Sequence, residues 1–199
     1  KTDLVILGRR GKYDVRIDVA RAGNGAPWSM TPVITELGGK TLESPEGLTF
    51  VANVKTDLEN VARDRAALIR KNPNKPDYLG AASCASCHPS EHATWSGSRH
   101  AHAWDPMVST KNTLNPLCLH CHTVGFMEPN GYVIGSDDKP LQGVGCESCH
   151  GPGSRHVADP RGNPLGVVGE AKCRTCHTSG QTPDFDFNEF WPKIRHGKP

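Results

Sequence analysis

The sequence predicts a chain of two parts: a small β-rich unit with one helix over residues 1–77, and a mainly α-helical and irregular domain over residues 78–199. All eight cysteines and all ten histidines lie in the second part. Gly (21) and Pro (16) are abundant, whereas hydrophobic residues make up only 36% of the chain. We therefore expect a loop-rich second part wrapped around something other than a protein core.

The first part shows strand patterns. An apolar run at residues 4–7 and a turn at residues 8–12 precede residues 13–19, which alternate between apolar and charged side chains. This pattern predicts a β-hairpin. Residues 33–37 and 48–54 predict two further strands, separated by glycine and proline breaks. A small antiparallel sheet should result.

One helix should end the first part. Thr56 and Glu59 have the spacing of a capping box, apolar residues follow at helical spacing, and Asn72 and Pro73 should stop the helix. We expect its charged face to be solvated and residues 72–79 to form a linker. Further along, we expect short helices after Cys84 and near His196 and a loop over residues 151–169.

The charge pattern excludes several partners. The formal net charge is +2 and charges of both signs are interspersed, so no footprint for nucleic acid or a membrane surface is present. No run approaches the ~20 apolar residues of a transmembrane helix. No signal peptide precedes Lys1, and we expect the numbering to begin after processing, with the chain cut from a longer precursor as one possibility.

The eight cysteines form four pairs, each with two residues between its members and a histidine directly after the second. The pairs are Cys84 and Cys87, Cys118 and Cys121, Cys146 and Cys149, and Cys173 and Cys176. This CxxCH pattern predicts covalent attachment of haem c, because two thiols add to the porphyrin vinyl groups and the next histidine then binds the iron. Zinc sites or disulfides would not require those histidines. We predict four covalently bound haem c groups.

The histidines of the four motifs should be the proximal iron ligands: His88, His122, His150 and His177. Six others remain as candidates for the opposite side of the iron: His92, His100, His102, His120, His156 and His196. Methionine is the rival ligand, at Met30, Met107 and Met127. We expect histidine on both sides, which favours lower reduction potentials than His/Met ligation.

The place of each remaining histidine in the sequence limits which haem iron it can bind. His92 lies one helical turn beyond His88, so it should share the proximal side of that haem. His120 lies within the second motif and cannot reach the far face of its own haem, so it is exposed or serves another haem. His100 and His102 are two residues apart and project in different directions, which lets them serve two centres.

Residues 78–197 resemble the cytochrome c-554 family of tetrahaem cytochromes. The resemblance rests on the first motif followed by Trp95, Ser98 and His100, on GVGCESCHGPG at residues 143–153, and on FDFNEFWPKIRH at residues 185–196.

The resemblance implies distal ligation by His100, His156 and His196, and no sixth protein ligand for the haem on His122. Because His102 and His120 lie nearby in this sequence, we expect His102 to fill that position. The first part has a weaker resemblance, through GRRGKY at residues 8–13, to the tail of calcineurin-like phosphoesterases. No phosphoesterase metal signature accompanies it, so no phosphatase activity is expected.

We therefore predict an electron-transfer protein, not an enzyme, that works in the periplasm or outside the cell with redox partner proteins or extracellular electron acceptors. One alternative is a haem enzyme that reduces a small nitrogen oxide at a five-coordinate iron. Another is a subunit of an extracellular cytochrome filament, a homopolymer in which His120 or, less readily, His92 binds a neighbour's haem.

Overall fold

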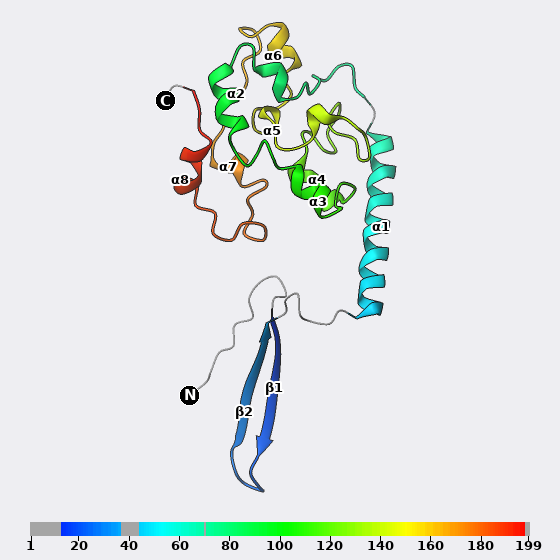
Figure 1. The fold of residues 1–199 in the computed structure, drawn as a ribbon, viewed down its shortest axis with the longest axis vertical. Helices are drawn as coiled ribbons and strands as arrows, with labels where there is room; N and C mark the ends of the chain where they lie inside the picture. The colour runs from blue at the N-terminus through cyan, green and yellow to red at the C-terminus, as the bar shows by residue number, and fades with distance from the viewer. Residues whose placement is uncertain (1–12, 37–43, 70, 198–199) are drawn as a thin grey trace. The chain divides into compact units, whose positions relative to one another are not determined.

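A computed structural model describes residues 13–36, 44–69 and 71–197 of the chain (Figure 1). The chain divides into two compact units, Lys1–Phe50 and Val51–Pro199. This division falls inside helix α1 (Pro45–Leu68), ahead of the boundary that we expected after residue 77. Within the described ranges, no helix has the length and apolar character needed to cross a membrane.

The first unit contains a two-stranded antiparallel sheet of β1 (Tyr13–Arg21) and β2 (Trp28–Glu36). The strand predicted at residues 13–19 is confirmed as β1, and β2 includes residues 33–36 of a second predicted strand. Residues 4–12, which supply the rest of the predicted hairpin, lie outside the described residues. The hairpin that the structure describes therefore pairs β1 with the strand that follows it.

The two faces of this sheet differ. Apolar side chains alternate onto one face and are 53% to 69% exposed: Ile17, Val19, Trp28, Met30 and Ile34. On the other face, Arg16 forms an ion pair of 2.9 Å with Asp18. No described residue buries the apolar face, so the residues that the structure describes give this sheet no core.

The prediction of a strand at residues 48–54 is wrong, because these residues belong to α1. Ser44 and Pro45 start the helix: the Gly47 amide donates to Ser44 Oγ at 3.2 Å, and Pro45 occupies the first helical position. The capping box at Thr56 is also wrong, since the Thr56 hydroxyl donates to the Ala52 carbonyl within the helix at 3.1 Å. The helix ends at Leu68, before the predicted stop.

The second unit consists of short helices joined by irregular segments, which confirms the mainly helical and irregular prediction. Its helices after α1 are η1 (Ala81–Cys84), α2 (Pro89–Ser96), α3 (Asp105–Ser109), α4 (Pro116–His122), η2 (Lys139–Leu141), α5 (Cys146–His150), α6 (Ser154–Ala158), α7 (Glu170–Cys173), α8 (Phe187–Phe190) and η3 (Trp191–Lys193). Short helices follow Cys84 and precede His196 as expected, and the loop predicted over residues 151–169 contains α6.

A small apolar core lies beside the second motif. Its buried members are Ala62, Met107, Leu119, Val124, Phe126, Tyr132, Ile134 and Leu141. Ala62 brings the later part of α1 into this cluster, and the Lys55 ammonium donates to the Lys111 carbonyl at 2.7 Å. The buried cluster includes a residue of the second motif, Leu119, and none from the other three motifs.

Candidate haem sites

Each CxxCH motif lies in or beside one short helical turn. We call the motifs at residues 84–88, 118–122, 146–150 and 173–177 the first to fourth sites. In the first, the His88 amide donates to the Cys84 carbonyl at 2.9 Å; in the fourth, the His177 amide does the same to Cys173. One turn therefore brings the cysteines and the histidine of a motif to the same place, as attachment to one porphyrin requires.

Cysteines of different sites lie next to one another. Before attachment, burial and then the neighbouring Cys84 thiol raise the pKa of Cys146 to about 12. Burial and then Cys176 raise the pKa of Cys121 to about 12. Burial and then Cys173 raise the pKa of Cys149. In space the sites therefore follow the order first, third, fourth, second.

Three motif histidines face a histidine from elsewhere in the chain. The ring centroids of His88 and His156 are 6.2 Å apart. Those of His150 and His196 are 6.0 Å apart, and those of His177 and His100 are 6.1 Å apart. The structure thus brings His100, His156 and His196 each to a different motif histidine.

These separations fit one iron per pair. An imidazole nitrogen binds a first-row metal at about 2 Å and lies about 1 Å from its ring centre, so two imidazoles on one iron have centroids roughly 6 Å apart. In the part of the chain that the structure describes, no group of three or more His, Cys, Asp and Glu side chains is arranged to hold a metal ion. The histidines meet in pairs, as axial ligation of haem requires.

Hydrogen bonds orient the rings for this role. The Nδ1 atoms of His150, His156 and His196 lie 3.3, 3.0 and 2.9 Å from the carbonyls of Gly166, Asn163 and Ile194. His177 Nδ1 lies 3.1 Å from Thr182 Oγ1, and His122 Nδ1 contacts the Ala103 carbonyl. A carbonyl only accepts, so in the four contacts to carbonyls Nδ1 carries the proton and Nε2 is left with its lone pair for a metal. The chain therefore fits bis-imidazole haem.

Burial favours the neutral rings that ligation needs. It lowers the pKa of His177, and burial followed by the nearby His177 ring lowers the pKa of His100. Burial also lowers the pKa of His150, with the neighbouring His196 ring acting in the same direction. A neutral imidazole can donate its Nε2 lone pair to iron, whereas imidazolium cannot.

The remaining histidines have different surroundings. The His102 side chain is 69% exposed, and its Nδ1 lies 3.6 Å from the Asp105 carboxylate. His92 contacts Trp95, with centroids 5.2 Å apart, and His120 is exposed on α4. Among the described residues, His122 makes no ring contact with another histidine, so the structure does not bring His102 to it.

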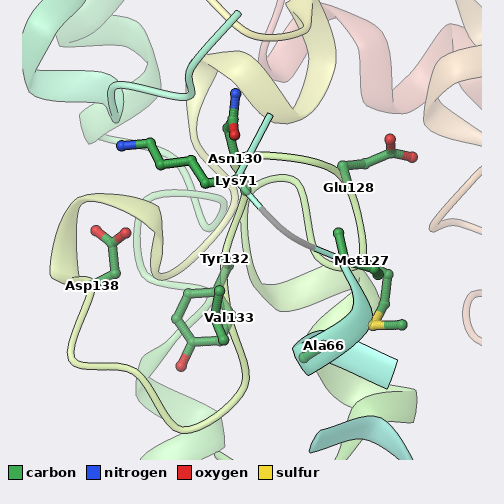
Figure 2. Close-up of a pocket in the computed structure, with 10 residues that line it drawn as sticks. Ala66, Lys71, Met127, Glu128, Asn130, Tyr132, Val133 and Asp138 are labelled. Carbon is green, nitrogen blue, oxygen red and sulfur yellow. The ribbon is translucent and has the colours of Figure 1, made fainter. Parts of the chain in front are cut away.

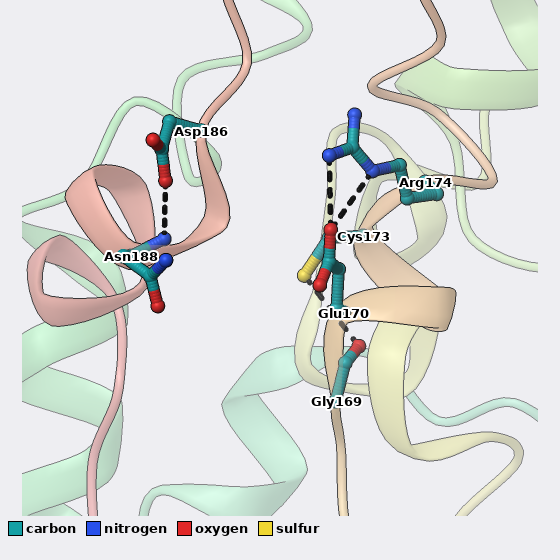
Figure 3. A network of polar contacts seen from close by, with 6 residues as sticks. All are labelled: Gly169, Glu170, Cys173, Arg174, Asp186 and Asn188. Atoms are coloured by element: carbon teal, nitrogen blue, oxygen red, sulfur yellow. Dashed lines mark hydrogen bonds and ion pairs between the residues drawn. The ribbon is translucent and has the colours of Figure 1, made fainter.

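Aromatic packing supports the fourth site. Phe185 stacks on the His177 ring at 4.7 Å, and the Arg174 guanidinium lies over Phe185 at 4.9 Å. Arg174 is held by an ion pair of 2.9 Å with Glu170 across one turn of helix (Figure 3). Nearby, the Asp186 carboxylate caps α8, because its Oδ1 accepts from the Asn188 backbone amide at 2.8 Å (Figure 3). Phe185, with Arg174 behind it, therefore packs against one face of the His177 ring.

A surface pocket lies apart from the paired histidines. Its lining includes Ala66, Met127, Tyr132 and Val133 and contains neither histidine nor cysteine (Figure 2). At its edge Asn130 joins two segments, because its Oδ1 accepts from the Asn72 amide at 2.7 Å. This pocket has no group suited to haem attachment.

Sequence reasoning missed Glu147, which lies inside the third motif and is only 4% exposed. Its carboxylate accepts three backbone amides, those of Leu79, Gly80 and Gly153. The residues between the two cysteines of a CxxCH motif vary freely in the attachment chemistry, so nothing in the pattern singled out this side chain.

Repeated CxxCH turns, with histidine rings paired at the separation of one iron, define a c-type cytochrome, a class that holds haem covalently. Comparison with known proteins agrees: residues 83–151 match the family model for cytochrome c554 and c-prime. The chain is 36% identical to cytochrome c-554 of Nitrosomonas europaea over an alignment of 99 positions. This segment therefore carries a cytochrome c554 family domain.

The alignment covers 42% of this chain and 42% of that relative, so less than half of either protein is compared. No solved structure matches the chain significantly. The resemblance of the first part to phosphoesterases stays a prediction.

Proposed function

We propose that this protein is a multihaem c-type cytochrome that carries electrons through four covalently bound haem c groups. The observation that supports it best is the set of three histidine pairs at 6.0 to 6.2 Å, each joining one motif to a distant segment. Bound haem would supply the iron that changes oxidation state, while the chain would set ligation, spacing and exposure.

In this proposal all eight motif cysteines form thioethers, and His88, His122, His150 and His177 are the proximal ligands. His156 serves the first site, His196 the third and His100 the fourth, as their ring pairs suggest. His102 loses support as a ligand within its own chain, because its ring faces Asp105.

The order of the sites suggests a route. Adjacent cysteines link the first site to the third, the third to the fourth, and the fourth to the second. Electrons would therefore enter and leave through the first and second sites. Redox partners in the periplasm or extracellular acceptors would dock near these two ends.

Spectroscopy of the purified native protein tests the proposal. Mass spectrometry under denaturing conditions should retain four haems, and at least three of them should be low-spin and reversibly reducible. Free haem with an apoprotein, or a protein whose haems do not take up electrons reversibly, would refute it.

A second function is favoured by the second site. Because His122 has no histidine partner within the described residues, its iron would lack a distal histidine within a single chain, and with no methionine bound in its place this position would be open. Such an iron binds small ligands and would let the protein reduce a small nitrogen oxide. Rapid binding of carbon monoxide or nitric oxide to one reduced haem in four, followed by turnover of the nitrogen oxide, would support the enzyme. Ligand binding without turnover of the nitrogen oxide would support the electron carrier and count against the enzyme.

Assembly into a homopolymer would fill the distal position of the second-site iron with a histidine from a neighbouring copy. His120 is exposed on α4 and would bind a haem of a neighbouring copy, a role that His92 fills less readily. The second-site iron should then be high-spin in dissociated subunits and low-spin after assembly. Electron microscopy of native material tests for an extracellular filament directly.

The hairpin offers a surface for a second copy of the chain. Its five exposed apolar side chains present on the order of 500 Å², and two such faces together approach the ~1,000 Å² of a specific interface. On this same face, Arg21 lies at the turn end and Glu36 at the open end. Antiparallel packing of two hairpins would bring each Arg21 toward the partner's Glu36. This contact closes on two copies, so a filament needs another contact as well.

A further inference from the structure

The carboxylate of Glu147 is the most completely bonded buried charge in the described chain. Its Oε2 accepts from the Gly80 amide at 2.7 Å and from the Leu79 amide at 2.9 Å. Its Oε1 accepts from the Gly153 amide at 2.7 Å and shares the Leu79 amide at 3.0 Å. All its partners are N–H donors, so the group acts as an anion, and no ion pair among the described residues includes it.

The amides that it binds begin two different segments. Gly80 directly precedes η1, which ends at Cys84 and leads to His88. Gly153 directly precedes α6, which carries His156. These two histidines are the pair whose rings lie 6.2 Å apart. One carboxylate therefore ties together the two arms that carry both axial ligands of the first site, and it does so from within the third motif.

The surrounding backbone leaves little freedom for this arrangement. Gly80 has φ +83°, and a Cβ there would lie 2.6 Å from the Pro140 carbonyl oxygen. The same two segments also meet one step further out, where the Asp77 amide donates to Ser154 Oγ at 2.7 Å. The carboxylate is thus the innermost tie between these segments.

The charge of Glu147 also reaches two sites. Glu147 directly follows Cys146 of the third motif, and its carboxylate accepts from the Gly80 amide just before η1, which ends at Cys84 of the first motif. A fixed anion near an iron stabilises the ferric form, which has one more positive charge than the ferrous form. Its effect is strong where burial excludes water.

We propose that Glu147 is a positioning residue that holds His88 and His156 to one iron and lowers the reduction potentials of the first and third haems. This inference rests on the proposed haem-binding function. It assigns to one side chain both the ligand geometry of the first site and an electrostatic bias on two of the four sites.

Three variants test it in the full, haem-loaded protein. Glu147→Gln removes the charge at nearly the same shape, Glu147→Asp keeps the charge on a shorter arm, and Glu147→Ala removes both. Glu128→Gln is the matched control, since the Glu128 side chain is exposed and lines the surface pocket that contains neither histidine nor cysteine. The readouts are haem count by mass, low-spin signals by electron paramagnetic resonance, and a spectroscopic redox titration.

We expect Glu147→Gln to keep four haems and to raise the midpoint potentials of two of them, with Glu147→Asp restoring values near the wild type. Glu147→Ala should in addition change the low-spin signal of one haem in four. Glu128→Gln should change neither readout. If Glu147→Gln does not accumulate, Glu147→Asp should still shift the signal of the first haem while leaving the potentials low.

Unchanged potentials and signals in the loaded Glu147 variants would overturn the inference, as would an equal shift in Glu128→Gln or in all four haems. Failure of the proposed function would look different, because the wild-type protein itself would then lack four reducible haems.

Discussion

The described residues form at most a small protein core in either unit of this chain, and the two units differ in what they leave exposed. The hairpin of the first unit has a regular ladder but exposes its apolar face, with Met30 69% and Trp28 62% exposed. The second unit has little regular structure and a small buried cluster around Leu119. The sequence of the second unit contains the CxxCH motifs that attach the proposed haems, and these haems would complete its interior. The sequence of the first unit contains no such motif.

This difference shows which structural features a local sequence pattern can predict. Thioether attachment needs two thiols and an imidazole at fixed spacing, so the cofactor leaves a local signature. A protein surface that covers a sheet needs only apolar side chains, and these look the same whether the cover is the chain itself or another molecule.

The largest effect should follow from removing one haem from the middle of the series. Cys146→Ala with Cys149→Ala abolishes the third attachment, which lies between the first and fourth sites. Because the described core is small, we expect the second unit to lose its ordered structure at 37 °C, measured by circular dichroism and haem absorbance. Ser86→Ala, an exposed change between two motif cysteines, is the control and should leave both signals unchanged. A stable double variant with three normal haems would show that the protein core suffices.

The next effect concerns the protein core itself. Leu119 is fully buried within the second motif, whereas Leu117, two residues earlier on α4, is 70% exposed. Leu119→Ala should lower the free energy of unfolding by about 2–5 kcal/mol through the cavity it leaves. Leu117→Ala should change it by about 0.5 kcal/mol or less. Denaturant titration of the haem-loaded protein measures both, and equal losses would mean that haem contacts alone hold α4.

Much of the fold could be predicted from the sequence where spacing decides it. Alternation predicted β1, and the CxxCH pattern with scattered Gly and Pro predicted short helices in irregular chain. The prediction of a strand at residues 48–54 is wrong because its apolar residues also suit a helix, and because Pro45 starts that helix instead of breaking the chain before a strand. Ser44 before Pro45 was the available signal, since serine caps a helix and proline suits its first position.

The sites could be predicted only in part. Each CxxCH motif is local, so its cysteines and histidine follow from the sequence. The approach of His156, His196 and His100 to motif histidines depends on long-range packing, and only the family resemblance pointed to it. Glu147 had no signal at all, because its partners are backbone amides, which every sequence supplies.

A smaller effect should separate paired from unpaired histidines. His196→Ala should convert one haem in four to high-spin, since its ring lies 6.0 Å from that of His150, with little loss of stability. His102→Ala is the comparison and should leave every spin state unchanged in the single chain, because His102 faces Asp105. Electron paramagnetic resonance spectra of the oxidised proteins measure the haem spin states of both variants. A high-spin haem in His102→Ala that the wild-type protein lacks would restore His102 as the ligand of the second site.

Substitutions in the hairpin should have the smallest effect on the haems. They test whether a second copy of the chain covers the apolar face of the hairpin. Met30 and Thr31 are adjacent on β2 and project to opposite faces, so Met30→Lys places a charge on the apolar face and Thr31→Lys on the polar one. If a second copy covers the apolar face, Met30→Lys should weaken self-association at least tenfold in sedimentation velocity, and Thr31→Lys should not. Haem spectra should be identical in all three proteins. A monomeric wild-type protein, or equal behaviour of the two variants, would mean that something other than a second copy covers this face. The sheet would then be completed by its own chain or by a different partner, and the two units would have less in common than their exposed surfaces suggest.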